Sequence, residues 1–232
     1  MRLDSDGHTA NVSFTINRLP ILGIEGLMAQ LPLFDHSATC PPLDGGLVSL
    51  HRDFLSLKEA EHLYQALLDL PGWKLDQIRI FGRIHDVPRL HRWFATSTQA
   101  YRWSGITMIP EPFPSALELI RGRISALAQT NFNSALGNLY RDGHDSVSWH
   151  ADDEAELGTR PVIASLSLGA TRRFLLRRKD DHNQKAAFDL SAGSLLIMAG
   201  DTQRYWEHCV PKTGHKVGPR INVTFRDIQS IP

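Results

Sequence analysis

The sequence contains only two cysteines among its 232 residues, Cys40 and Cys209. Cys40 lies in a proline-rich segment and Cys209 directly follows a histidine, so we expect no structural disulfide. The sequence also lacks an apolar run long enough to span a bilayer, and its first residues lack the apolar segment of a secretory signal. These absences predict a soluble intracellular protein without a membrane partner, located in the cytoplasm of a bacterium or in the nucleus of a eukaryote.

A net charge is absent too, because 25 basic residues balance 25 acidic ones. A neutral chain is not expected to be a strong nonspecific binder of nucleic acid. The basic residues are nevertheless clustered in two places. One cluster comprises Arg79, Arg83, Arg89, Arg92 and Arg102, and the second comprises Arg172, Arg173, Arg177, Arg178 and Lys179. The second cluster fits a solvated surface as well as it fits a binding surface.

The first 45 residues show no sustained hydrophobic period and contain four prolines, Pro20, Pro32, Pro41 and Pro42. We interpret residues 1–45 as an N-terminal extension that is partly disordered or lies along the surface. Residues 46–232 then form one domain, which is long enough to bury a sizeable core. No heptad repeat is present, so we expect a monomer.

Capping boxes mark the starts of two predicted helices. Ser56 and Glu59 precede apolar residues at helical spacing, and Ser115 and Glu118 do the same further along the chain. A strand over Leu47–His51 precedes the first helix, and short strands separated by glycine-bearing turns follow the second. This pattern predicts an α+β fold, a double-stranded β-helix (jelly roll) with helices packed on one side. The residues expected to face inward are Ala60, Leu63, Tyr64, Leu67 and Leu68 in the first helix and Leu117, Ile120, Ile124 and Leu127 in the second.

Three residues are candidate metal ligands. His150 and Asp152 are two apart, so they would lie on one face of a strand that runs into a turn. His208, on a later apolar run that we expect in the same sheet, offers a third ligand. Two imidazoles and one carboxylate on one side of an octahedron leave open positions, the arrangement of non-haem Fe(II) oxygenases. The His-x-Asp pair alone is a weak signal, because the chain has 11 histidines.

The segment from Pro219 to Arg226 alternates polar and apolar residues and predicts a strand. Its polar face would carry Arg220, Asn222, Thr224 and Arg226, with Ile221, Val223 and Phe225 packed behind. Two guanidinium groups on one strand face require an anion. A dicarboxylate is a natural partner, because the guanidinium fork matches the geometry of a carboxylate and stays charged.

The order of these motifs resembles that of the AlkB family of Fe(II)- and 2-oxoglutarate-dependent dioxygenases. The matching motifs are Asn138-x-Tyr140, His150-x-Asp152, His208 and Arg220-x-Asn222-x-Thr224-Phe225-Arg226, and the resemblance extends from about Leu47 to Asp227. Upstream, Ile80-Phe81-Gly82, Val87-Pro88-Arg89 and Tyr101-Arg102-Trp103-Ser104-Gly105 are most similar to the relatives that repair duplex DNA in animal nuclei.

The resemblance implies an enzyme that uses Fe(II), 2-oxoglutarate and O2. Its iron ligands and catalytic residues would be His150, Asp152 and His208. Its co-substrate residues would be Asn138, Tyr140, Arg220, Asn222 and Arg226, of which Arg226 could instead support the metal ligands. The implied reaction is oxidative demethylation of 1-methyladenine and 3-methylcytosine in DNA. It releases formaldehyde, is coupled to decarboxylation of 2-oxoglutarate to succinate, and repairs the damage directly.

The resemblance also assigns nucleotide recognition to a region of about residues 75–110. Phe81 at a hairpin turn would wedge into a base stack, and Tyr101 and Trp103 would stack on the extruded base. Asp153 and Glu154 follow a metal ligand directly, and one of them would contact the damaged base. The alternative is that the three aromatic residues belong to the core and that the acids form a solvated turn.

Other functions remain open at this point. The chain could demethylate RNA, a lipid or a protein, or it could bind damaged DNA without catalysis. A zinc hydrolase with the same three ligands is a further alternative, although the arginine pair would have no role in it. Leu139 stands where many relatives carry arginine, and Ala151 replaces a larger polar residue, so the preferred substrate is open.

Overall fold

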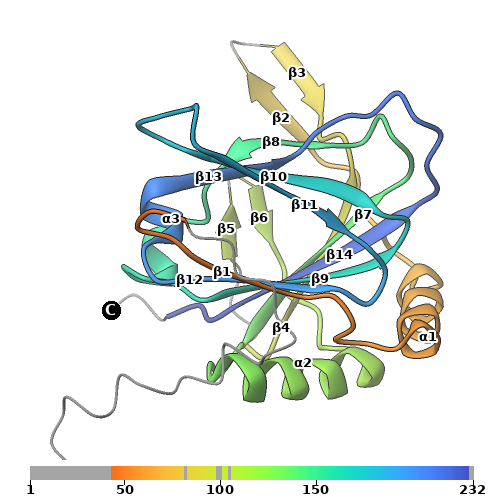
Figure 1. The fold of residues 1–232 in the computed structure, drawn as a ribbon. Coiled ribbons are helices and arrows are strands. Elements are labelled where there is room, and N and C mark those ends of the chain that lie inside the picture. The colour runs from red at the N-terminus through yellow and green to blue at the C-terminus, as the bar shows by residue number, and fades with distance from the viewer. Residues whose placement is uncertain (1–42, 81–82, 98–100, 104–105, 230–232) are drawn as a thin grey trace, which may run out of the picture. The chain divides into compact units, whose positions relative to one another are not determined.

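The computed structural model describes residues 43–80, 83–97, 101–103 and 106–229, all within one compact unit, Pro32–Pro232. Figure 1 shows the strands of this unit arranged in two main sheets, with helices at the periphery. Within the described ranges, no helix is long and apolar enough to cross a membrane. Cys209 is buried and free, whereas Cys40 lies outside the described residues.

Every strand pairing in the two main sheets is antiparallel. The large sheet has the order β1 (Leu47–His51), β12 (Leu195–Ala199), β9 (Ile163–Gly169), β14 (Arg220–Arg226), β7 (Ser134–Tyr140) and β4 (Leu90–Ala95). The small sheet has the order β11 (Lys185–Leu190), β10 (Arg172–Arg178), β13 (Trp206–Val210) and β8 (Val147–His150). Successive strands change sheets repeatedly, as in a jelly roll.

The large sheet has two buried faces, because side chains alternate along each strand. The odd residues of β14, such as Val223, pack with Leu166 of β9 against the helices. The opposite face carries Met198, which packs against Phe174 and other apolar residues of the small sheet. Polar residues interrupt this inter-sheet core where Asn138, Ser165 and Asn222 are all buried. That interruption is where the candidate site lies.

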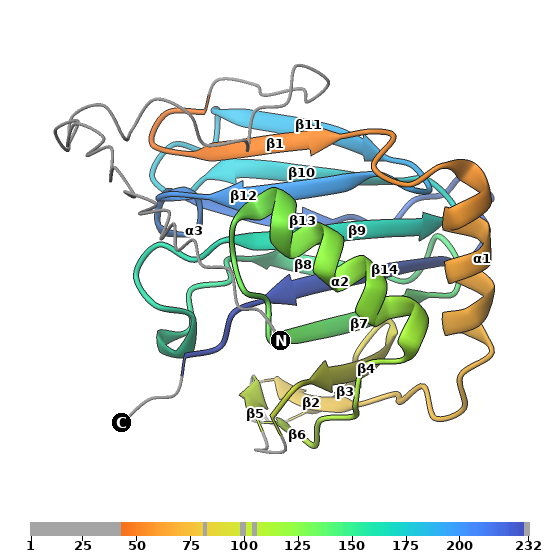
Figure 2. The same ribbon diagram turned by 90° about the horizontal axis from the view of Figure 1, so that it is seen from below.

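Two helices, α1 (Leu57–Leu68) and α2 (Ser115–Ala128), pack on the outer face of the large sheet. Figure 2 shows α2 lying across β9, β14 and β7, with α1 next to it. The capping box of α1 is present, because the backbone N–H of Glu59 donates to Ser56 Oγ and the N–H of Ser56 donates to Glu59 Oε2. A short helix, α3 (Thr202–Tyr205), and a 3-10 turn at Ala155–Leu157 complete the helical elements of the described residues. The predicted α+β jelly roll is confirmed.

The second predicted capping box is wrong. The N-cap of α2 is Pro114, and Ser115 is already its first helical residue. Pro114 has an extended ψ of 144°, and its carbonyl accepts from the N–H groups of both Leu117 and Glu118. The side chain of Glu118 pairs with Arg121 instead of the cap. The proline therefore begins the helix one position earlier than the Ser-x-x-Glu pattern indicates.

The second basic cluster is not a uniform solvated surface. Because side chains alternate along β10, Arg172 is buried whereas Arg173 is exposed. The guanidinium of Arg177 stacks 4.1 Å from the ring centroid of Trp149 and pairs with Glu207. Two further cations of the cluster are paired with acids, Arg178 with Asp44 and Asp180, and Lys179 with Asp153. Most of these charges are therefore neutralised within the protein.

Two small hairpins precede α2 in the chain. β2 (Gln77–Ile80) pairs with β3 (Arg83–Asp86), and β5 (Tyr101–Trp103) pairs with β6 (Ile106–Met108). Ile80 pairs with Arg83, so the predicted hairpin around Gly82 is confirmed. Figure 1 shows β2 and β3 projecting beyond the two main sheets. Lys74, which precedes β2, pairs with His91 of β4 at the edge of the large sheet. This pairing attaches the hairpin to that edge.

The capping box of α1 gives a testable difference between two serines. Ser56→Ala should lower the free energy of unfolding by about 1 kcal/mol, because the N–H of Glu59 loses its side-chain acceptor. Ser115→Ala is the control, since Ser115 makes no capping hydrogen bond and alanine is the better helix former. Urea denaturation followed by circular dichroism measures both variants. Equal losses in the two variants would contradict the placement of the cap at Ser56.

Candidate active site

The three candidate metal ligands lie together on neighbouring strands of the small sheet. β8 ends at His150, Asp152 follows in the next turn, and β13 carries His208. His208 pairs directly with His150, and the centroids of the two rings are 4.3 Å apart. The candidate ligand atoms of all three residues lie within 4.8 Å of one another. The predicted cluster of two imidazoles and one carboxylate is confirmed, and this donor set suits Fe(II).

The surroundings of these residues favour the forms that bind a metal. Burial and the neighbouring His150 lower the pKa of His208 to about 3, so its imidazole is neutral at neutral pH. Burial alone would raise the pKa of Asp152, but the Arg226 guanidinium above all, together with the adjacent imidazole groups, holds that pKa well below its usual range. Nδ1 of His150 lies 2.8 Å from the carbonyl oxygen of Ser148. If Nδ1 donates there, Nε2 of His150 remains available for the metal.

Asp152 is fixed from two sides by residues of other elements. Nη2 of Arg226, the last residue of β14, donates to Asp152 Oδ1 at 2.8 Å. The backbone N–H of Asp152 donates to Oε1 of Gln203, on α3, at 2.9 Å. All three residues are buried. These contacts orient the carboxylate toward His208, whose Nε2 lies 4.0 Å from Asp152 Oδ2.

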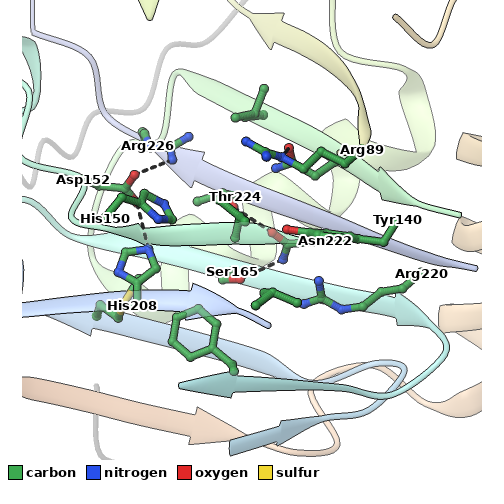
Figure 3. Close-up of a pocket in the computed structure, with 16 residues that line it drawn as sticks. Arg89, Tyr140, His150, Asp152, Ser165, His208, Arg220, Asn222, Thr224 and Arg226 are labelled. Atoms are coloured by element: carbon green, nitrogen blue, oxygen red, sulfur yellow. Dashed lines mark hydrogen bonds and ion pairs between the residues drawn. The ribbon is translucent and has the colours of Figure 1, made fainter. Parts of the chain in front are cut away.

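Arg220 lies at the other end of the pocket. Figure 3 shows Arg220 and Tyr140 opposite the three candidate metal ligands. The guanidinium Nη2 donates to Ser167 Oγ at 2.9 Å, whereas Nε and Nη1 have no hydrogen-bond partner among the described residues. Burial lowers the pKa of Arg220 to about 10, so the group stays cationic at neutral pH. A buried cation with unused donors is costly unless an anion lies beside it.

Hydrogen-bonded polar residues connect the two ends of the pocket. The amide nitrogen of Asn222 donates to Ser165 Oγ at 2.8 Å and to the carbonyl oxygen of Leu166 at 3.0 Å. Its amide oxygen accepts from the hydroxyl of Thr224 at 3.0 Å. Both N–H groups of Asn222 are therefore used within the protein, so this residue shapes the pocket wall. The oxygen of Asn138 accepts from Nε of Arg89 at 2.7 Å.

All eight predicted metal and co-substrate residues line this one pocket, between the inner faces of the two sheets. Seven further side chains of the pocket are apolar or hydroxyl-bearing, and one is cationic. Among the described residues, the lining consists of Arg89, Leu136, Asn138, Tyr140, Val147, His150, Asp152, Ser165, Phe174, Met198, His208, Val210, Arg220, Asn222, Thr224 and Arg226.

Of the predicted substrate residues, Asp153 and Glu154 have described side chains, and neither belongs to this lining. Asp153 is exposed, and its carboxylate pairs with Lys179 Nζ at 3.0 Å. Glu154 is half-buried, and burial together with the charge of Asp152 raises its pKa. Tyr101 and Trp103 are the ends of β5, but their side chains lie outside the described part of the structure, as does the whole of Phe81. The roles of these five residues stay predictions.

Sequence reasoning missed several residues of the site. Arg89 was predicted only as a member of a basic cluster and not as a pocket residue. The available signal was the Val87-Pro88-Arg89 motif, which is part of the family resemblance. Ser165 and Ser167 alternate with leucines in β9, and two hydroxyls on one face of an apolar strand were the available signal. Gln203 had no such signal, because its contact with Asp152 joins residues 51 apart in the sequence.

Comparison with known proteins agrees with this geometry. Residues 47–226 match the 2OG-Fe(II) oxygenase superfamily. The sequence is 41% identical over 198 residues to alpha-ketoglutarate-dependent dioxygenase alkB homolog 3 of Mus musculus, covering 80% of this chain and 67% of that one. It is 36% identical over 180 residues to DNA oxidative demethylase ALKBH2 of Homo sapiens, covering 73% of this chain and 69% of that one. The chain thus spans about two thirds of the length of these relatives.

A solved structure, that of OsALKBH1, has the same fold with a TM-score of 0.55. The two sequences are 17% identical, and the match covers 78% of this chain and 97% of that one. At this identity the likeness speaks for the fold alone, whereas the family match spans residues 47–226 and so includes every residue of the pocket lining listed above. The chain therefore belongs to the 2OG-Fe(II) oxygenase superfamily and, within it, to the AlkB family of Fe(II)- and 2-oxoglutarate-dependent dioxygenases.

Proposed function

We propose that this dioxygenase removes methyl groups oxidatively from 1-methyladenine and 3-methylcytosine in DNA, and so repairs alkylation damage directly. The proposal rests on one observation about the pocket. A cluster of metal ligands and a buried guanidinium with unused donors occupy opposite ends of a single pocket. A 2-oxo dicarboxylate can chelate a metal at one end and pair with a guanidinium at the other.

The residues present fit both Fe(II) and 2-oxoglutarate. His150, Asp152 and His208 would hold the metal, and Arg220 would hold the far carboxylate of the co-substrate, with Asn138, Tyr140, Asn222 and Arg226 around it. When bound with O2, these cofactors supply the oxidation that converts 2-oxoglutarate to succinate and CO2 and hydroxylates an N-methyl group. The hydroxymethyl group then leaves as formaldehyde, and the ring nitrogen is restored.

The chain's own residues bind, orient and shield the reactants. The Arg220 fork would fix the direction of the co-substrate, because its remaining donors lie beside the pocket. Arg226 would keep Asp152 ionised and oriented. Leu136, Phe174 and other apolar side chains of the lining would exclude water from the space next to the ligands.

The substrate assignment rests on the relatives and on the residue types that the family resemblance assigns to base recognition. One relative is by name a DNA oxidative demethylase. A methylated base carries positive charge, so aromatic faces and carboxylates both attract it. Tyr101, Trp103, Asp153 and Glu154 supply such groups, and Phe81 would hold the gap from which the base is extruded. RNA is the runner-up substrate, whereas family membership removes the zinc hydrolase alternative.

The organisation of the chain follows from the same proposal. Residues 46–232 would form the dioxygenase domain, with nucleotide recognition in residues 75–110, and residues 1–45 would form an extension. A DNA substrate would place the protein in the nucleus of a eukaryote or in the cytoplasm of a bacterium. We further propose that the protein acts as a monomer.

The direct test uses oligonucleotides that carry 1-methyladenine or 3-methylcytosine, incubated with Fe(II), 2-oxoglutarate, ascorbate and O2. Formaldehyde and succinate should appear in equal amounts and only when 2-oxoglutarate is present. His208→Ala should lower turnover by about 1000-fold or more, because it removes a metal ligand. His144→Ala, which alters an exposed histidine, should retain activity. Binding of DNA without turnover would contradict the demethylase proposal. Turnover on RNA alone would show that RNA, and not DNA, is the substrate.

The hairpin wedge predicts a strand preference. Phe81→Ala should reduce turnover on double-stranded DNA by about tenfold more than on single-stranded DNA, because only the duplex requires a base to be unstacked. Ile84→Ala is the control, since Ile84 is exposed on the same hairpin but belongs to β3 and not to the turn. Initial rates on matched duplex and single-stranded oligonucleotides give the ratio. An unchanged ratio for Phe81→Ala would show that this residue is not a wedge.

Acid should destabilise the metal-free protein through His208. Its folded pKa of about 3 lies below the ordinary value of 6.5, so between these pH values the unfolded chain binds a proton that the folded protein excludes. The free energy of unfolding should fall by about 1 kcal/mol per pH unit from this group as the pH drops from 6.5 toward about 3, and it should not change above pH 6.5 on its account.

Urea titrations in the presence of a chelator, at about pH 7 and about pH 5, measure this effect. His208→Gln should reduce the loss of stability on acidification. His144→Gln should leave the loss unchanged, because His144 is exposed. Equal pH dependence in the wild type and in His208→Gln would contradict the burial of a neutral imidazole at this position.

A further inference from the structure

Arg172 is a buried cation behind the candidate co-substrate end of the pocket. It is the first residue of β10, and 3% of it is exposed. Its guanidinium donates to three backbone carbonyl oxygens, those of Asp142 at 2.9 Å, Asp145 at 2.8 Å and Pro211 at 2.8 Å. One side chain therefore joins the loop between β7 and β8 to the loop between β13 and β14.

These two loops are continuous with the residues that we assign to the co-substrate. Tyr140 ends β7 immediately before the first loop, and Arg220 begins β14 immediately after the second. The guanidinium carbon of Arg172 lies 5.6 Å from the centroid of the Tyr140 ring, and that of Arg220 lies 5.2 Å from the same centroid. Two guanidinium groups thus contact one aromatic ring.

The charge of Arg172 is not cancelled by a direct ion pair in the described residues. Its three hydrogen-bond acceptors are neutral carbonyls. The nearby carboxylate of Asp145 is engaged by Arg141, through Nε, Nη2 and the backbone N–H, each at 2.8 Å. The charge of Arg172 also lowers the pKa of Arg220, so the two cations repel each other. An anion bound beside Arg220 would relieve this repulsion.

We propose that Arg172 is a positioning residue that sets the selectivity of the enzyme for a dicarboxylate co-substrate. It holds Tyr140 and Arg220 in place through the two loops, and it adds a second positive charge at the end of the pocket that receives the far carboxylate. The proposal rests on the assignment of Arg220 to that carboxylate. It does not depend on which nucleic acid is demethylated.

The test compares two 2-oxo acids that differ at the far end. 2-Oxoglutarate carries a carboxylate there, whereas 2-oxopentanoate carries a methyl group. Anaerobic calorimetric titration of the Fe(II)-loaded protein gives the dissociation constant of each acid without any turnover. Arg172→Met should weaken 2-oxoglutarate binding by about tenfold or more, because it removes a charge at close range in a low-dielectric site. It should change 2-oxopentanoate binding by less than about twofold.

Three further variants complete the design. Arg172→Lys keeps the charge and loses the fork, so it should weaken 2-oxoglutarate binding less than Arg172→Met does. Arg173→Met, which alters the exposed neighbour on β10, should change neither acid. Arg220→Met should abolish the preference for 2-oxoglutarate. Binding of 2-oxopentanoate by each variant shows that the variant is folded.

The outcomes separate the two assignments. If Arg172→Met weakens both acids equally, or weakens neither, Arg172 does not set dicarboxylate selectivity and the proposal is overturned. If Arg220→Met keeps the preference for 2-oxoglutarate, the assignment of the co-substrate end is wrong, and the proposal for Arg172 falls with it. If Arg220→Met loses the preference while Arg172→Met retains it, only the proposal for Arg172 fails.

Discussion

Burial of the polar face of β14 is the constraint on which the rest of the structure depends. All seven residues of this strand are buried, so it places two guanidinium groups, an amide and a hydroxyl inside the protein. Groups at that depth must be hydrogen-bonded. Two serines of β9 bond to Asn222 and Arg220, and the carboxylate of Asp152 pairs with Arg226. Nε and Nη1 of Arg220 are left without a partner among the described residues, and our proposal assigns these donors to the far carboxylate of the co-substrate.

The same strand couples the two sheets at the candidate metal site. The ligands come from the small sheet, where His150 and His208 are directly paired across β8 and β13. Their carboxylate partner, Asp152, is held by Arg226 of the large sheet. The relative positions of the ligands are therefore set by strand register and by an inter-sheet ion pair. A site built in this way is organised before the metal arrives.

Features that depend on the local periodicity of side chains can be predicted from the sequence. Contacts between residues that are far apart in the sequence cannot. The alternation from Arg220 to Arg226 predicts the buried strand and its polar face correctly, and the spacing of His150 and Asp152 predicts a shared face. The Ser115 pattern predicts the N-cap of α2 at the wrong residue. Pro114 is the N-cap, and its carbonyl accepts hydrogen bonds from the first N–H groups of the helix. In the sequence, Arg172 is only one member of a basic cluster that fits a solvated surface. Its burial could not be predicted, because its carbonyl partners lie 27 to 39 residues away.

The candidate active site and the β2–β3 hairpin occupy separate parts of the architecture. The metal ligands and Arg220 lie between the two sheets, whereas the β2–β3 hairpin is attached at the β4 edge through the Asp76–His91 pair at 3.0 Å and the pairing of Lys74 with His91. Arg89 connects the two regions, because it follows the hairpin and donates to Asn138 in the pocket. Arg89 therefore joins the chain that follows the hairpin to the Asn138 side of the pocket, whereas the candidate metal ligands lie on or next to strands of the small sheet.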